Sequence, residues 1–228
     1  YYGINWHTAD NTALPHLAEE MAKARRRLSD AVFRRNYKAD FFAFVGKVFE
    51  SFVDDATHLV ERIPRRAMLA TWGGADWGHA HPGAGICLGA TASGDLYAWA
   101  EEYAEGLVVA PPPRNEFADC WVNRFARRDV SHWWADPSLP GHIQTCRNAG
   151  LDMGPADNAV ARGIDLLSTL LTPVEVRPGL VRPSLFIHRS CRNLRRELVS
   201  YAYDDKTGRP VKKDDHAVDA LRYGLYTE

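Results

Sequence analysis

The chain has 228 residues, of which 46% are hydrophobic and 25% charged, with a formal net charge of −1 at pH 7. These values are ordinary for a soluble globular protein and leave room for one large domain, with or without an arm. No apolar run reaches the roughly 18 residues of a membrane-spanning helix, and no signal peptide is recognisable, so we expect no membrane partner.

The first 66 residues differ in pattern from the rest. Residues 13–38 predict a polar helix with few apolar positions, which is typical of an arm or linker helix. The aromatic-rich segment 41–52 and the following segment 57–64 predict short strands or an extended wrap ahead of the main domain. Gly46-Lys47 is not a phosphate-binding loop, because Val48 stands where such a loop needs Ser or Thr.

From Met68 onward the pattern predicts alternating strands and helices. Three antiparallel strands come first, with a Ser93-Gly94-Asp95 turn between the second and the third. The following elements are expected to be a helix in 114–128, a strand in 130–136, a helix in 140–149, a strand in 151–157, a helix in 158–171, an extended piece in 183–190 and helices in 191–205 and 211–226. This order predicts an α/β fold with a mixed sheet.

Charge and cysteine usage add two expectations. The four cysteines form no C-x-x-C pair, so we interpret them as reduced, mostly buried thiols of a cytoplasmic protein. Basic residues cluster at 23–27, 34–35, 65–66, 127–128, 189–196 and 206–213. Any one cluster is most simply a solvated helix face, but a nearly neutral protein can still carry a basic groove.

Aspartates stand at the points where chemistry is expected. Asp76 and Asp136 each end a predicted strand, and Asp214-Asp215 opens the last helix. A single strand-end Asp is more often a turn former or helix cap. Together, carboxylates at strand ends without a His/Cys set fit a site for hard divalent cations, which relieve the repulsion among clustered acids.

The paired aspartates invite separate roles. Only one side chain can cap a helix, and the next residue is already turned by about 100°. We predict that Asp214 caps and that Asp215 is the main metal ligand, with Asp214 near enough to help or to replace it. Asp219 shares the polar side of the helix and is interpreted as a partner of Arg222 or a residue that orients the site, rather than as a ligand.

Several motifs, in order, resemble the nuclease domain of phage large terminases, the DNA-packaging motor proteins. They are "GADWGHAHPGAG" at 74–85, "WWADPS" at 133–138 and the C-terminal run "CRNLRRELVSYAYDDKTGRPVKKDDHAVDALRYGLY" at 191–226. The segments "GKVFESF" and "THLVERIP" resemble the connection between the ATPase and the nuclease. The resemblance covers about residues 30–228.

This resemblance implies an RNase H-like mixed sheet flanked by helices, two Mg²⁺ or Mn²⁺ ions, and endonucleolytic cutting of concatemeric viral DNA in the host cell cytoplasm. It implies that Asp76, Asp136 and Asp215 or Asp214 are the catalytic metal ligands. Residues 1–66 then correspond to an arm from a preceding ATPase domain, and 67–228 to the nuclease. The implied partners are double-stranded DNA, the ATPase domain of the same polypeptide, the portal and the small terminase subunit.

Two other functions stay open at this point. One is another RNase H-like nuclease, of the resolvase or transposase type, against which the C-terminal run counts. The other is a non-catalytic module that grips DNA or docks within the packaging motor. Many relatives carry a Lys before the helix predicted from Asn158, whereas Arg162 is the nearest base here, so no role for a Lys is carried over.

Histidines and tryptophans near these motifs are weaker candidates. His79 and His81 are interpreted as parts of a structural loop, and His216 as a group that could touch phosphate or orient a ligand. The tryptophans near the acidic strands are interpreted as core packing rather than base stacking: Trp72, Trp77, Trp133 and Trp134.

Overall fold

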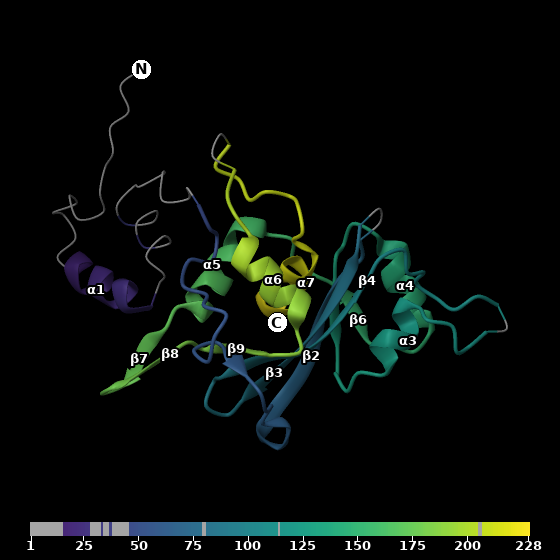
Figure 1. The fold of residues 1–228 in the computed structure, drawn as a ribbon, viewed down its shortest axis with the longest axis horizontal. Helices are drawn as coiled ribbons and strands as arrows, with labels where there is room; N and C mark the ends of the chain where they lie inside the picture. The colour runs from purple at the N-terminus through teal and green to yellow at the C-terminus, as the bar shows by residue number, and fades with distance from the viewer. Residues whose placement is uncertain are drawn as a thin grey trace.

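The computed structural model describes residues 16–27, 33, 37, 46–78, 81–113, 115–204 and 207–228. A seven-stranded sheet with the order β1-β9-β4-β3-β2-β5-β6 forms its centre (Figure 1). The strands are β1 (Leu59–Val60), β2 (Met68–Asp76), β3 (Gly83–Thr91), β4 (Leu96–Ala104), β5 (Trp133–Ala135), β6 (Met153–Pro155) and β9 (Leu185–His188). A separate two-stranded hairpin consists of β7 (Val174–Arg177) and β8 (Leu180–Arg182).

The sheet is mixed, as the sequence predicted. β2, β3 and β4 pair in antiparallel fashion, while β5 and β6 extend the sheet in parallel on one side and β9 and β1 on the other. The helices are α1 (Leu17–Arg27), the short 3₁₀ helix η2 (Arg65–Ala67), α3 (Trp121–Ala126), α4 (Pro140–Asn148), α5 (Val160–Leu171), α6 (Arg192–Ser200) and α7 (His216–Thr227).

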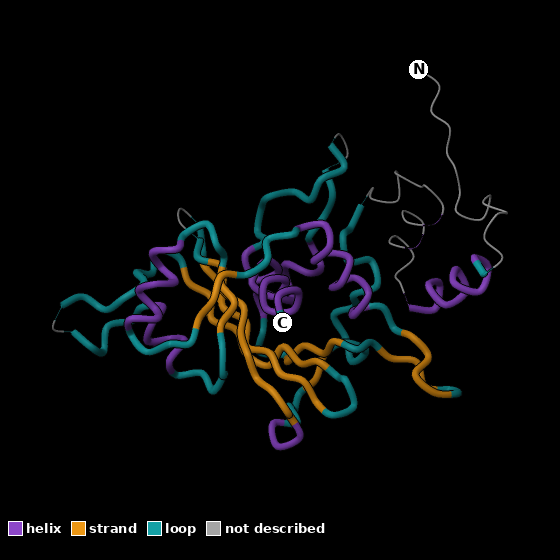
Figure 2. The backbone as a smooth tube through the Cα atoms, turned by 180° about the vertical axis from the view of Figure 1, so that it is seen from behind, coloured by secondary structure: helices purple, strands orange, loops and turns teal. Residues whose placement is uncertain are grey.

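Helices cover both faces of the sheet (Figure 2). One buried cluster joins α5, α6 and α7 to side chains of β2, β3, β4 and β9. The other cluster joins α3 and α4 to β2, β3, β4, β5 and β6. The alternation of side chains along the central strands supplies both clusters, so each face of the sheet buries an apolar layer.

Two glycines let α7 lie directly on β2. A methyl group built on Gly74 would come within 1.9 Å of the carbonyl oxygen of Ala220, and one on Gly224 within 3.0 Å of the backbone nitrogen of Gly74. The indole nitrogen of Trp72 donates to the carbonyl oxygen of Gly224 at 2.7 Å. This close contact carries the start of α7 towards Asp76, the last residue of β2.

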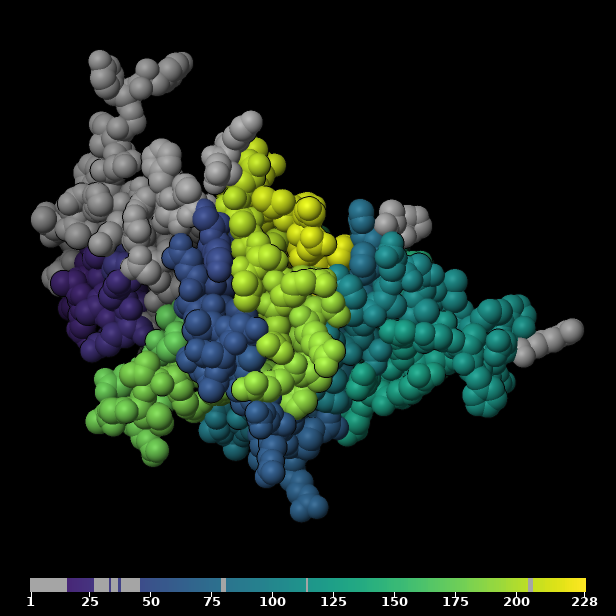
Figure 3. Space-filling model, viewed as in Figure 1, coloured from purple at the N-terminus to yellow at the C-terminus, as the bar shows by residue number. Residues whose placement is uncertain are grey.

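The segment from residue 46 to β1 packs on the main domain. β1 pairs in parallel with β9, and Phe49 and Phe52 are buried in the cluster of α5, α6 and α7. The amide of Val48 donates to the carbonyl oxygen of Tyr201 at 2.9 Å, just after α6. Figure 3 shows this segment in blue alongside α6 in yellow-green. This packing joins residues on the two sides of the predicted domain boundary between residues 66 and 67. The boundary itself stays a prediction.

Other expectations have mixed outcomes. The four cysteines are free and buried, as predicted. α3 is shorter than expected, because the amides of Trp121 and Val122 pair with loop carbonyls of Val108 and Val109. α6 ends at Ser200, since Tyr201 adopts an extended backbone. The sequence did not predict the β7–β8 hairpin. None of the described helices combines the length and the apolar character needed to cross a bilayer.

Candidate metal centre

Adjacent parallel strands place Asp76 and Asp136 at one edge of the sheet. Asp76 ends β2, and Asp136 directly follows β5. Ala75 lies opposite Ala135 in the register, and the amide of Asp136 donates to the carbonyl oxygen of Ala75 at 2.9 Å. The carboxyl ends of parallel strands therefore bring the two acids together, as the sequence predicted.

The start of α7 completes the site from the other side. A pocket of about 560 Å³ is lined by Asp76, Trp77, Gly78, His81, Pro82, Asp136, Ser138, Leu139, Lys212, Lys213, Asp214, Asp215, His216 and Asp219. All four aspartates proposed from the sequence line this pocket. The imidazole Nδ1 of His216 lies 2.9 Å from Oδ2 of Asp76, which ties the helix to the strand end.

Asp76 lies in repulsive electrostatic surroundings. Burial raises the pKa of Asp76, and the charges of Asp219 and Asp136 raise it further, while the hydrogen bond from His216 opposes the rise. The same hydrogen bond raises the pKa of His216. A cation in the pocket would relieve the repulsion that these carboxylates exert on one another.

Asp136 is held by its own turn. Its Oδ1 accepts from the amide of Ser138 at 3.0 Å, and its Oδ2 accepts from the hydroxyl of Ser138. The indole nitrogen of Trp77 donates to the carbonyl oxygen of Asp136 at 3.1 Å. Asp136 is thus a turn former and a lining residue of the pocket at the same time.

The predicted roles at the helix start need one correction. Asp215, not Asp214, occupies the N-cap position of α7, and neither side chain caps the helix. Asp214 is exposed and adopts a left-handed backbone with a φ of 50°, which turns the chain into the helix. The prediction that Asp214 caps α7 is therefore wrong, and a carboxylate from α6 caps the helix instead: Glu197 accepts from the amides of Ala217 and Val218.

One carboxylate oxygen of Asp215 lies in the protein interior without a hydrogen-bond partner among the described residues. Asp215 is buried, and among the described residues its Oδ2 has no hydrogen-bond partner. Burial raises the pKa of Asp215, and the charge of Asp219 raises it further. A buried carboxylate oxygen without a donor is costly, so its chemistry fits a cation ligand.

Asp219 pairs with Arg222, as interpreted from the sequence. Nε of the fully buried Arg222 donates to Oδ1 of Asp219 at 3.1 Å, and Nζ of Lys212 lies 3.6 Å from Oδ2. Arg222 also reaches the side-chain oxygen of Asn158 at 3.3 Å. Asp219 nevertheless lines the pocket, so it contributes negative charge to the site.

The weaker candidates separate into two groups. The ring of His81 stacks on His216 with centroids 5.9 Å apart, and both line the pocket, whereas His79 lies outside the described residues. Arg162 lies over the ring of Tyr226 and does not line the pocket. The interpretation of the tryptophans as packing residues is confirmed for Trp72, Trp77 and Trp133, which are buried; Trp134 is half-buried and donates to Glu228.

The donor set suits a hard divalent cation. The acids that line the pocket offer carboxylate oxygens, the ligands that Mg²⁺ and Mn²⁺ prefer. In the described ranges, no three His, Cys, Asp or Glu side chains already stand close enough together to hold one ion. The aspartates therefore share a pocket without forming a closed cage.

Sequence reasoning missed Glu197 as a residue that supports the site. The signal was present, since Glu197 interrupts the apolar stripe of α6 between Leu194 and Leu198, both fully buried. A carboxylate at such a position needs hydrogen-bond donors from another element. The sequence offered no means to identify those donors as the first amides of α7.

Comparison with known proteins agrees with the motif resemblance. No protein-family model matches the chain. The large terminase subunit of Escherichia phage T5 is 25% identical over 222 residues, which cover 91% of this chain and 48% of that protein. The chain thus spans about half the length of this curated relative.

Three solved structures share the fold. The large terminase of a thermophilic bacteriophage has a TM-score of 0.71 at 22% identity, covering 96% of this chain and 54% of that one. The nuclease domain of the P22 large terminase has a TM-score of 0.61 at 17% identity, covering 79% and 91%. The SPP1 large terminase nuclease domain with bound Mn has a TM-score of 0.55 at 20% identity, covering 78% and 97%. The resemblance to the nuclease domain of phage large terminases is confirmed, and the fold is RNase H-like.

Proposed function

We propose that this chain is the nuclease part of a phage large terminase and that it cuts concatemeric viral double-stranded DNA in the host cell cytoplasm. One observation carries the proposal: Asp76, Asp136, Asp214 and Asp215 line one pocket at the edge of an RNase H-like sheet. The SPP1 nuclease domain, which shares the fold, is known with bound Mn. A metal-dependent endonuclease accounts for both the fold and the acidic pocket.

Asp76, Asp136 and Asp215 would hold two Mg²⁺ or Mn²⁺ ions, with Asp214 assisting. When bound, such ions supply an activated water and stabilise the charge that develops on the leaving 3′ oxygen. The chain itself orients the ligands. His216 holds the Asp76 carboxylate through Nδ1, and the Ser138 turn holds that of Asp136.

Basic residues at the rim of the pocket would bind the DNA backbone. Lys212 and Lys213 line the pocket beside the acids, where they can contact phosphates without reading sequence. Arg195 of α6 is already engaged, since its guanidinium meets both carboxylate oxygens of Asp54 at 2.6 and 2.9 Å. We assign phosphate binding to Lys213, to Lys212, whose ion pair with Asp219 is long at 3.6 Å, and to the exposed arginines of the 189–196 cluster.

The proposed partners follow from the relatives. The chain covers 54% of the large terminase of the thermophilic bacteriophage but 97% of the SPP1 nuclease domain chain. We infer an ATPase domain in the same polypeptide, and contacts with the portal and the small terminase subunit in the packaging motor. Within the chain, we propose that residues 67–228 form the nuclease and residues 1–66 the arm, of which the part from residue 46 is seated on the nuclease.

Plasmid nicking tests the proposal. The chain is expected to nick supercoiled DNA with Mg²⁺ or Mn²⁺ and not with EDTA. Asp76→Ala and Asp136→Ala should each abolish nicking while retaining the fold by circular dichroism. Asp129→Ala is the matched control, because this acid is 91% exposed and pairs with Arg65 away from the pocket. Nicking retained by either pocket variant would contradict the site.

The same assay separates the other two functions. A non-catalytic module of the packaging motor would bind DNA with the expected salt dependence but would not nick it with either metal. A resolvase-type nuclease would cut branched DNA in strong preference to linear duplex. The proposed enzyme is expected to cut ordinary duplex DNA without a sharp sequence consensus, which mapping of the cut ends would measure.

A further inference from the structure

α7 depends on another helix for its cap. The two amides that open its first turn, those of Ala217 and Val218, donate to Oε2 of Glu197 at 2.7 and 3.1 Å. Asp215 stands at the N-cap position but turns its side chain elsewhere. The donors that a helix start normally gives to its own N-cap are therefore satisfied by α6.

Glu197 is buried, and both of its carboxylate oxygens accept hydrogen bonds. It is 0% exposed, and its other oxygen, Oε1, accepts from the hydroxyl of Tyr103 on β4 at 2.9 Å. Burial raises the pKa of Glu197 to about 7, against the opposing effect of these donors. With three donors from two elements, the Glu197 carboxylate has one orientation, and the start of α7 is fixed relative to β4.

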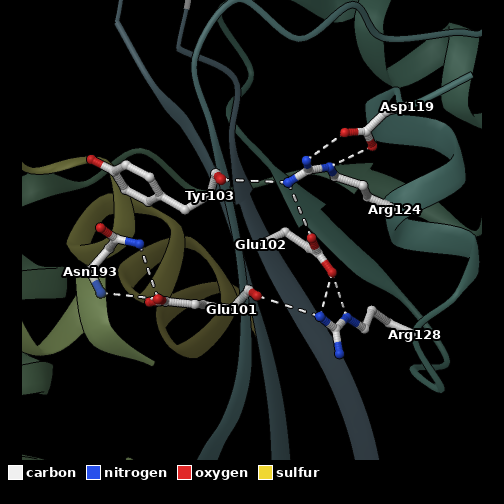
Figure 4. Close-up of polar contacts among 7 residues, drawn as sticks. All are labelled: Glu101, Glu102, Tyr103, Asp119, Arg124, Arg128 and Asn193. Carbon is white, nitrogen blue, oxygen red and sulfur yellow. Dashed lines mark hydrogen bonds and ion pairs between the residues drawn. The ribbon is translucent and has the colours of Figure 1, made fainter. Parts of the chain in front are cut away.

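α6 is anchored in the same manner. The carboxylate of Glu101 on β4 accepts from the amides of Asn193 and Leu194 at 3.0 Å each, and α6 has no cap from its own N-cap side chain. Figure 4 shows Glu101 directed to Asn193, while its neighbour Glu102 is directed to Arg124 and Arg128 on the other side of the strand. β4 thus holds α6, and α6 holds α7.

The capped turn carries the site residues. Asp215 and His216 directly precede the two amides that Glu197 binds. The carbonyl oxygen of Asp215 accepts from the amide of Asp219 at 2.7 Å, so the same turn also sets the position of Asp219. Loss of the cap would free the first turn of α7 and let Asp215 and His216 move away from Asp76.

We propose that Glu197 is a positioning residue for the metal site, acting through the amides of Ala217 and Val218 to hold Asp215 and His216 against Asp76. This inference rests on the proposed function, because it takes the acidic pocket as the site that binds the metal. Glu197 itself contacts neither metal nor DNA. Its contribution is to keep the ligands from α7 in register with those from the strands.

Mn²⁺ titration by isothermal calorimetry tests the inference on the full chain. Glu197→Ala is expected to weaken Mn²⁺ binding by about 10- to 100-fold, the range found when groups that orient metal ligands are removed. Glu197→Gln keeps an acceptor oxygen for both amides and should bind close to the unaltered chain. Glu101→Ala is the matched control: it removes the equivalent cap from α6, but Tyr103 still holds Glu197, so thermal stability should fall while Mn²⁺ affinity falls much less than in Glu197→Ala.

Each outcome of the titration bears on a different claim. Unchanged Mn²⁺ affinity in Glu197→Ala overturns the inference, as does an equal loss in Glu101→Ala or in Glu197→Gln. If Glu197→Ala does not fold, Glu197→Asp replaces it, since its shorter carboxylate retreats from the amides and should weaken binding; unchanged affinity there also overturns the inference. An unaltered chain that binds no Mn²⁺ and nicks no DNA contradicts the proposed function instead.

Discussion

The two halves of the candidate site are held by different means. Asp76 and Asp136 leave neighbouring parallel strands, and the bond from the Asp136 amide to the Ala75 carbonyl belongs to the sheet itself. Asp214 and Asp215 follow a loop and open a helix whose cap comes from another helix. The strand half is set by a regular ladder, whereas the helix half is set by individual tertiary contacts.

This difference indicates which half of the site can change conformation more easily. A ladder positions its strand ends as long as the sheet exists, so the strand half is as stable as the core. The helix half can open locally without loss of the sheet, because its first turn relies on a few bonds. Each of the following changes tests that contrast.

The largest effect is expected from Asp215→Asn. If Asp215 is the ligand we propose, removing its charge should lower nicking on the order of a hundredfold or more, since several kcal/mol of charge stabilisation is lost. Asp214→Asn should lower it by less than about tenfold, because Asp214 is exposed and its proposed role is only to assist. Nicking rates over a range of Mn²⁺ concentrations measure both. A dead Asp214→Asn beside a nearly normal Asp215→Asn would reverse the assignment.

Gly74→Ala should push α7 away from β2. The added methyl would lie 1.9 Å from the Ala220 carbonyl oxygen, so α7 must shift. We expect a loss of about 3 kcal/mol or more in the free energy of unfolding, and weaker Mn²⁺ binding. Urea denaturation measures the first. Gly141→Ala is the control, since no atom lies within 4 Å of the added methyl; an equal loss there would contradict the explanation.

The apo protein should lose stability as pH rises towards neutrality. Folding raises the pKa of Glu197 from 4.5 to about 7, and those of Asp76, Asp215 and His216 also rise. A folded state that holds protons more tightly has its full stability at low pH and loses it as pH rises through the folded pKa. Glu197 alone contributes on the order of 3 kcal/mol to this fall, between about pH 4.5 and 7.

Thermal unfolding in EDTA from pH 5 to 8 measures this dependence. Glu197→Gln should flatten it, and Mn²⁺ at pH 7.5 should raise the melting temperature by binding the folded state. A melting temperature that climbs steadily from pH 5 to 8 in EDTA would contradict the raised pKa values of these four groups.

The smallest effect is expected from removing residues 1–44. The described ring contacts of Phe33 are to Tyr37 and Arg25, within the same segment. A chain that starts at Val45 should therefore fold and nick almost as well as the full chain. Circular dichroism and nicking measure the outcome, and an insoluble or unfolded product would show that the removed segment is structural.

A chain that starts at residue 67 tests how much residues 45–66 contribute to stability. It lacks β1 and the buried Phe49 and Phe52, and each lost aromatic side chain costs about 3 to 5 kcal/mol. It also lacks the bond from Val48 to Tyr201, which braces the end of α6. We expect this chain to be far less stable than the one that starts at Val45.

The strand half could be predicted from the sequence because its determinants are local. Asp76 and Asp136 follow short apolar runs, and period, length and turn residues suffice to place them at strand ends. The role of Asp214 could not be predicted, because the capping bonds expected of it are made by Glu197, a residue from another helix. The β7–β8 hairpin turns at Pro178-Gly179, where Gly179 has a φ of 78°, but a Pro-Gly pair predicts a turn without showing that strands flank it.

The close backbone contact between Gly74 and Gly224 also determines whether a second substitution can restore the stability lost when either glycine is replaced by alanine. A methyl on Gly224 would lie 2.5 Å from the Leu88 side chain and 3.0 Å from the backbone nitrogen of Gly74, so a smaller residue at position 88 relieves only the first contact. A methyl on Gly74 would strike the backbone of Ala220 and Gly224, which no substitution removes. A second substitution should therefore restore Gly224→Ala in part and Gly74→Ala hardly at all, because every close contact of the Gly74 methyl is with backbone atoms.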